Sequence, residues 1–179
     1  MGCEKMEEQK YNHLQMICIV FLRVVIGWHF LYEGVYKFIK TGWSASGYLK
    51  LSKGPLAGLF NWMANTADVL TVVNFMNMWG LTLIGLGLIL GCFTRFSAIC
   101  GAFMVLLFYM ANPPFIGYFS STALEGNYLI VNKNLVEIAG LLVIAVTYSG
   151  RYLGFDRILH RLFMMMRGNK GTELKGATA

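Results

Sequence analysis

The sequence predicts an all-α integral membrane protein built as a single four-helix bundle. Hydrophobic residues make up 56% of the 179 residues and charged residues only 13%, whereas a soluble domain carries roughly 25% charge. Too little polar surface remains to cover a soluble globule, and the mean hydropathy of +0.55 excludes a disordered chain. Glycine, which is more frequent in membrane helices than in soluble ones, occurs 20 times.

Four apolar stretches approach the length of about 20 residues that a membrane-spanning helix needs. These predicted spans are residues 14–38, 69–92, 96–111 and 128–149. No charged residue interrupts the second and third of them, and Pro113 ends the third because proline cannot continue a helix. We assign residues 1–167 to one transmembrane domain and residues 168–179 to a flexible tail.

The distribution of Lys and Arg predicts how these helices are oriented. Most of these residues fall on the side that holds both termini and the turn at Arg95, and cytoplasmic loops carry an excess of them. We therefore expect both termini in the cytoplasm and the chain in the inner (cytoplasmic) membrane. The net charge of +6 is attributed to this bias and to anionic lipid. Nucleic acid is not expected as a partner, because no recognition module is visible.

Two segments outside the predicted spans have the features of short surface helices. The first outer connection, residues 40–67, contains aromatic side chains suited to the headgroup level and Pro55, which suits the first turn of a helix. We expect one or two short interfacial helices over the mouth of the bundle, and a simple lipid-facing belt is the alternative. Residues 153–167 have the pattern of a basic amphipathic helix lying on anionic lipid.

Small residues indicate the faces on which the helices pack, because they let helix backbones approach closely in lipid. The second span carries Gly80, Gly85, Gly87 and Gly91, and the third offers Ala98, Gly101 and Ala102. In the first span one stripe at helical spacing is formed by Arg23, Gly27, Phe30, Gly34 and Lys37. We interpret the glycines as packing positions.

Ionisable side chains inside a bilayer are costly, so we expect them to be paired or functional. At a rise of about 1.5 Å per residue, His29 and Glu137 lie at nearly the same depth. Glu33 and Lys133 also share a depth on this estimate, which puts them about one turn further out. If the first and fourth helices are neighbours, His29–Glu137 and Glu33–Lys133 are therefore natural ion pairs. Within the first helix, Glu33 is also four residues from both His29 and Lys37, so each of these pairs can touch. The long side chain of Arg23 is expected to reach toward Glu137.

The functional interpretation is a polar pocket in the outer half of the bundle that binds a quinone headgroup as substrate. A quinone needs a hydrogen-bond donor at each carbonyl and a proton source on reduction, which a histidine and a carboxylate supply. The predicted catalytic residues are His29, Glu33 and Glu137, and the predicted binding residues are Arg23, Trp28, Tyr32, Lys37 and Lys133. The alternative is an internal ion-pair network that only fixes the register of the helices.

No resident metal or cofactor is expected from the sequence. His29 is the single histidine of the predicted membrane core, so a bis-His haem within one chain is not available. Neither a zinc-ligand spacing nor a Gly-rich phosphate loop occurs. The four cysteines include no C-x-x-C motif, which argues against thiol–disulfide chemistry.

The stretch RVVIGWHFLYEGVYK resembles the opening helix of the DoxX/DoxD family. The family motif L-R-x-x-x-G-x-x-F-x-x-x-G-x-x-K is matched at Leu22, Arg23, Gly27, Phe30, Gly34 and Lys37. Other similar stretches are residues 43–56, which have the DoxD form, residues 86–98, residues 131–145 and the closing G-R-Y…D of Gly150 to Asp156. Where the second helix of the family often carries acidic residues, this chain has Asn74 and Asn77.

The resemblance implies a four-helix membrane bundle and a role beside a quinone-linked oxidoreductase, because the family includes the small membrane subunit of thiosulfate:quinone oxidoreductase. The leading expectation is a quinone-interacting subunit that passes electrons from a periplasmic or membrane-associated dehydrogenase to the quinone pool. The alternative is a non-catalytic anchor or assembly factor for a partner protein. A small-molecule permease is the least favoured, because four short spans are few for a transporter. Self-association into a homo-oligomer is left open.

Overall fold

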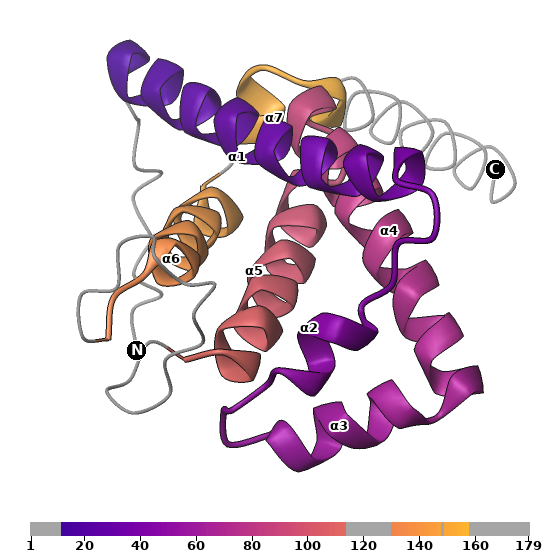
Figure 1. Ribbon diagram of the computed structural model, residues 1–179. Helices are drawn as coiled ribbons and strands as arrows, with labels where there is room; N and C mark the ends of the chain where they lie inside the picture. The colour runs from indigo at the N-terminus through magenta and orange to yellow at the C-terminus, as the bar shows by residue number, and fades with distance from the viewer. Residues whose placement is uncertain (1–11, 114–129, 148, 158–179) are drawn as a thin grey trace, which may run out of the picture.

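The computed structural model describes residues 12–113, 130–147 and 149–157, and these ranges are helical apart from short connections (Figure 1). The helices are α1 (His13–Ile39), α2 (Ser46–Lys50), α3 (Ala57–Asn65), α4 (Ala67–Leu90), α5 (Thr94–Ala111), α6 (Lys133–Val146) and α7 (Ser149–Tyr152). No β-strand occurs in the described ranges, so the predicted all-α class is confirmed.

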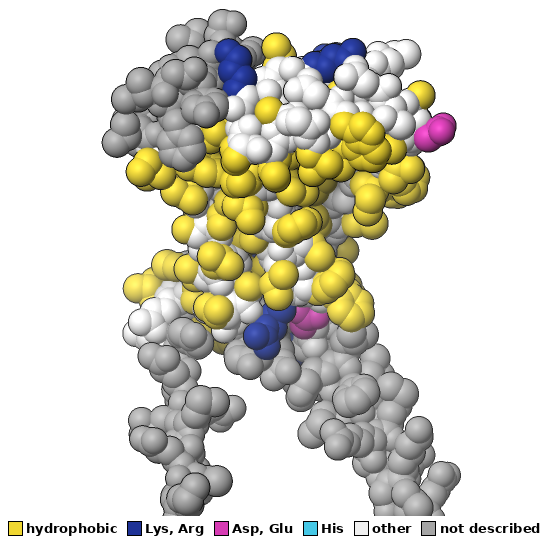
Figure 2. All heavy atoms as spheres, turned by 90° about the horizontal axis from the view of Figure 1, so that it is seen from below, with side chains coloured by type: hydrophobic (Ala, Val, Ile, Leu, Met, Phe, Trp, Pro, Cys, Tyr) yellow, Lys and Arg dark blue, Asp and Glu magenta, His cyan; other side chains and the backbone are white. Residues whose placement is uncertain are grey.

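Three of these helices are long and apolar enough to cross a membrane. They are α1, α4 and α5, with 27, 24 and 18 residues, and their bounds lie within two residues of the predicted spans. Figure 2 shows a broad belt of hydrophobic side chains with Lys and Arg at either end, as a bilayer requires. The fourth predicted span, residues 128–149, contains the helix α6, which has 14 residues. The complete four-span bundle therefore stays a prediction.

Two predicted features fall largely outside the described residues. The basic amphipathic helix was expected over residues 153–167, of which only 153–157 are described, and the tail at 168–179 is not described. The orientation of the chain in the membrane also stays a prediction.

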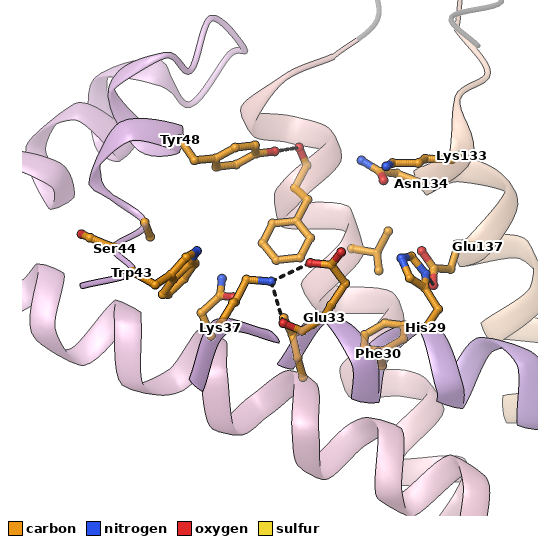
Figure 3. Close-up of a pocket in the computed structure, with 15 residues that line it drawn as sticks. His29, Phe30, Glu33, Lys37, Trp43, Ser44, Tyr48, Lys133, Asn134 and Glu137 are labelled. Carbon is orange, nitrogen blue, oxygen red and sulfur yellow. Dashed lines mark hydrogen bonds and ion pairs between the residues drawn. The ribbon is translucent and has the colours of Figure 1, made fainter. Parts of the chain in front are cut away.

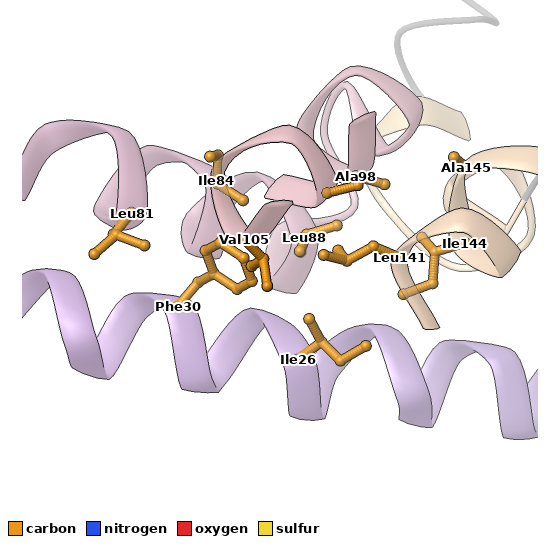
Figure 4. Packing of buried hydrophobic residues seen from close by; sticks show 11 residues of the cluster. Ile26, Phe30, Leu81, Ile84, Leu88, Ala98, Val105, Leu141, Ile144 and Ala145 are labelled. Atoms are coloured by element: carbon orange, nitrogen blue, oxygen red, sulfur yellow. The ribbon is translucent and has the colours of Figure 1, made fainter. Parts of the chain in front are cut away.

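Helix α1 packs along α4, and α5 packs along α6, and these two pairs meet around one apolar core (Figures 1 and 4). Phe30 of α1 and Leu88 of α4 lie at its centre, and Leu141 of α6 is fully buried against them. The core closes the middle of the bundle, so any polar cavity must lie toward one of its ends.

The contact between α1 and α4 depends on glycine. A Cβ atom at Gly34 would lie 2.7 Å from the backbone nitrogen of Thr82, and one at Gly85 would lie 2.5 Å from that of Leu31. Backbone atoms cannot move aside as a flexible side chain can, so these positions exclude larger residues. The predicted use of glycine for packing is confirmed here.

The turn between α4 and α5 is held by the far end of the chain. Gly91 and Phe93 both have positive φ, of 66° and 50°, so the chain reverses sharply here. The first amide groups of α5, like those of any helix, have no partner within the helix. Asp156 accepts hydrogen bonds from the backbone N–H groups of Phe93 and Thr94, at 2.7 and 3.0 Å. Its own N–H donates to the carbonyl oxygen of Gly91 at 2.8 Å.

The short helices α2 and α3 lie at the opposite end of the molecule, beside the end of α5 (Figure 1). Leu49 and Phe60 are buried there against Ala111, in a small apolar cluster separate from the main core. The hydroxyl group of Ser52 donates to the carbonyl oxygen of Ala111 at 2.8 Å, and Asn74 of α4 accepts from the N–H of Ala45 at 2.9 Å. The predicted short helices are therefore present, whereas their place at a membrane interface stays a prediction.

Candidate functional site

A cavity of about 360 Å³ lies between the helices at the end that α2 covers (Figure 3). Its walls come from α1, α4, α5 and α6, from the segment that leads into α2 and from α2 itself. The lining residues are His29, Phe30, Glu33, Lys37, Trp43, Ser44, Ala45, Tyr48, Asn77, Leu81, Val105, Phe108, Lys133, Asn134 and Glu137. We refer to this hollow as the polar cavity, because it gathers ionisable side chains that lie far apart in the sequence.

Three successive turns of α1 supply one wall. His29, Glu33 and Lys37 are spaced four residues apart, which places them on one face of a helix. The ammonium group of Lys37 lies 2.9 Å from Oε2 of Glu33 and donates to the carbonyl oxygen of the same residue at 3.3 Å. It also lies 5.5 Å from the centroid of the Trp43 ring. Lys37 is largely buried, with 12% of its side chain exposed, so its charge acts inside the cavity.

The second wall is α6, which is joined to α1 by one ion pair. Nδ1 of His29 lies 2.7 Å from Oε1 of Glu137, so the predicted pairing of these residues is present. Lys133 and Asn134 lie one turn before Glu137 and also line the cavity. Of the partners that spacing and depth allow Glu33, the structure pairs it with Lys37 on its own helix rather than with Lys133.

The end of the cavity toward α2 is aromatic and amide-lined. The Tyr48 hydroxyl donates to the carbonyl oxygen of Phe108 at 3.0 Å. Desolvation raises the pKa of this phenol above its ordinary value, so Tyr48 stays a neutral donor. The buried Oδ1 of Asn77 makes no hydrogen bond within the described residues, and an acceptor of this kind is available to a ligand.

Three predicted binding residues lie outside the cavity. Arg23 is buried at the other end of α1, where Nη2 donates to the carbonyl oxygen of Leu153 at 2.6 Å. Its guanidinium meets the segment at residues 149–157, which packs against this end of α1, and not Glu137 as predicted. Trp28 and Tyr32 are 63% and 59% exposed on the outer flank of α1, about 100° around the helix from the cavity-lining residues that follow them.

Ten of the cavity residues were not among the predicted site residues, and they include Trp43, Tyr48, Asn77 and Asn134. Trp43 and Tyr48 come from the first outer connection, where aromatic side chains indicated only a surface helix. Asn77 and Asn134 are neutral amides, which stand out less in an apolar helix than charged residues do. The expected position of that connection over the mouth of the bundle was the one available signal for the two aromatic residues.

These features define a helical membrane protein with an ion-paired cavity near one end of its bundle. The family model of DoxX matches residues 18–113, from within α1 to beyond the end of α5, and the chain belongs to the DoxX family. No curated protein and no solved structure matches the chain. Lys133 and Glu137 of the cavity lie beyond the matched residues.

Proposed function

We propose that the polar cavity binds the headgroup of a quinone, and that the protein is a quinone-interacting subunit of a membrane oxidoreductase. The observation that carries the proposal is the joint presence of two ion pairs, His29–Glu137 and Lys37–Glu33, around one hollow of about 360 Å³. A pure register lock needs no space between its charges. Aromatic and apolar side chains complete the walls, as is usual for sites that take a small planar ligand.

The two cations supply the donors that quinone carbonyls require. With its Nδ1 held by Glu137, the His29 imidazolium has Nε2–H to donate. Lys37 can turn one of its three N–H groups into the cavity while Glu33 holds another. Charge-assisted hydrogen bonds of this kind are stronger than neutral ones.

Reduction of a quinone to a quinol consumes two electrons and two protons. In this proposal the electrons come from a periplasmic or membrane-associated dehydrogenase. His29 donates a proton from Nε2 to the nearer carbonyl oxygen, and Glu137 holds the ring in position for that transfer. Lys37, held by Glu33 at 2.9 Å, donates the second proton to the other carbonyl oxygen, so that two protons accompany the two electrons. Water at the end of the bundle covered by α2 then returns one proton to each donor.

Binding is tested with Trp43 as the only tryptophan, after Trp28, Trp62 and Trp79 are replaced by Phe. A benzoquinone in the cavity is expected to quench Trp43, which lines it. His29→Ala is expected to weaken binding about tenfold or more, and His13→Ala, at the far end of α1 beside Tyr152, is the matched control. If no quinone quenches Trp43, or if both histidine variants bind equally well, the assignment is wrong.

A turnover assay separates binding from catalysis. Isolated with its native partner and given a soluble quinone, the His29→Ala protein should reduce quinone more slowly at unchanged membrane abundance. Loss of abundance together with activity would indicate a structural role instead.

A non-catalytic anchor is the second candidate, because both ion pairs are already closed, at 2.7 and 2.9 Å. The double exchange Glu33→Lys with Lys37→Glu distinguishes the two functions. It keeps an intrahelical pair but moves the cation away from Trp43. If the protein is an anchor, the exchanged variant should match the unmodified protein in membrane abundance and in partner binding. If the cavity is a quinone site, the variant should match it in abundance but bind quinone more weakly.

A further inference from the structure

A second hollow lies on the outside of the bundle, between α1 and α6. This groove has a volume of about 620 Å³ and shares His29, Lys133 and Glu137 with the polar cavity. The rest of its lining is chiefly apolar and includes Val25 and Val136, which are 49% and 63% exposed. In a membrane helix such exposed apolar side chains face lipid.

The groove and the polar cavity adjoin at the His29–Glu137 pair. The same two side chains line both hollows, so the pair forms the boundary between them. Helices α1 and α6 touch each other less extensively than α1 touches α4 or α5 touches α6. A ligand that occupies both hollows therefore separates the least tightly packed of these helix pairs.

The direction of the groove suits an amphiphile. From His29 it follows α1 back to Leu22, a distance of about 10 Å along the helix axis. The end of the cavity beyond His29 is covered by α2. The groove leads the other way, from the His29–Glu137 pair toward the middle of the bundle. A lipid-soluble ligand lies in a bilayer in this way, with its headgroup near the surface and its chain toward the midplane.

We propose that the groove between α1 and α6 holds the hydrocarbon chain of a long-chain quinone whose headgroup occupies the polar cavity. The inference rests on the proposed function and adds the place in which the hydrocarbon chain of the quinone is held. The chain crosses the His29–Glu137 pair only at the point where it leaves the headgroup, and the rest of it lies along the chiefly apolar groove. Entry through the end covered by α2 would instead draw the whole tail through the polar cavity.

The test compares two probes in the Trp43-only protein, reconstituted in lipid nanodiscs. They are 2,3-dimethoxy-5-methyl-1,4-benzoquinone and the same ring with a decyl chain. The variant Val25→Phe with Val136→Phe fills the groove from its lipid side, and Val24→Phe is the control, because Val24 is exposed but does not line the groove. Affinities are expressed per lipid volume, so that partitioning of the decyl probe does not count as binding.

The double variant is expected to weaken binding of the decyl probe at least fivefold and to leave binding of the tailless probe within twofold, with no change for Val24→Phe. Equal effects on both probes, or no effect on either, would overturn the groove assignment and leave the cavity assignment standing. If the groove instead contacts a second copy of the chain, the double variant should change the mass of the particle without changing its affinity for the decyl probe. That result would also overturn the groove assignment. Failure of both probes to bind the unmodified protein would remove the proposed function itself.

Discussion

Nδ1 of His29 lies 2.7 Å from Oε1 of Glu137, and this contact joins α1 to α6 across 108 positions of the chain. Glu137 is the more buried partner, with 11% of its side chain exposed against 50% for His29. Loss of the histidine would leave a carboxylate in the bundle without its cation. The pair is therefore expected to stabilise the fold whether or not the cavity binds a ligand.

A double-mutant cycle measures this coupling. We expect His29→Ala, Glu137→Ala and the double variant to give an interaction free energy of about 0.5–1.5 kcal/mol, the range found for interhelical hydrogen bonds in membrane proteins. The half-exposed histidine argues for the lower part of that range. The free energy of unfolding is measured by denaturant titration in detergent. Strict additivity of the two single variants would show that the contact contributes nothing to stability.

The His29–Glu137 pair was predictable because a helix rises by a fixed distance per residue. Two residues on antiparallel neighbours can be assigned a depth once the inner ends of the helices are estimated. The choice of partner for Glu33 was not predictable in this way, since Lys133 shares its estimated depth while Lys37 lies one helical turn away on the same helix. A side-chain rotation decides between them, and sequence spacing carries no information about it.

The inward face of α1 was harder to predict than its bounds. In a soluble protein the apolar face points inward, but both faces of a membrane helix are apolar. Hydrophobicity therefore does not distinguish Phe30, which is 2% exposed, from Trp28, which is 63% exposed. The small residues do distinguish them, because Gly27 and Gly34 share the face of Phe30 and are buried with it.

Arg23 shows what the sequence could not reveal about long-range contacts. It lies on the predicted stripe and is buried as that stripe predicts. Its partner, the carbonyl oxygen of Leu153, comes from a segment 130 positions away. Backbone carbonyl groups occur at every residue, so no sequence pattern identifies the one that a buried guanidinium meets.

The close approach of α1 and α4 gives a second prediction. Gly85→Ala is expected to destabilise the fold by about 1–3 kcal/mol, the usual range for overpacking, because its Cβ would meet the backbone nitrogen of Leu31. Gly58→Ala in α3 is the control, since nothing lies within 4 Å of the position that its new methyl group would take, and alanine favours the helix. Both variants are compared by thermal unfolding in detergent. Equal melting temperatures would show that the two helices are not held by glycine contact.

A third prediction concerns the turn between α4 and α5. Asp156→Ala removes two hydrogen bonds to the N–H groups of Phe93 and Thr94, and hydrogen bonds to charged groups contribute about 1.5–3 kcal/mol. A loss of that order in the free energy of unfolding is expected. Asp68→Ala is the matched control, because this exposed carboxylate lies in the first turn of α4 and should contribute only about 0.3–1 kcal/mol. A smaller loss at Asp156 than at Asp68 would contradict the capping role.

The last prediction concerns the cation beside Trp43. Lys37→Met keeps the length of the side chain but removes the charge that lies 2.9 Å from Glu33 and 5.5 Å from the Trp43 ring. Loss of a charge-assisted donor of about 1.5–3 kcal/mol should weaken quinone binding about tenfold to a hundredfold. Lys40→Met is the matched control, because Lys40 is exposed and lies over Tyr36 rather than in the cavity. The measurement is quinone quenching in the Trp43-only protein, together with the emission maximum of Trp43 before ligand is added. A shift in that maximum for Lys37→Met alone, with unchanged quinone affinity, would confirm the contact with Trp43 but exclude Lys37 as a ligand donor.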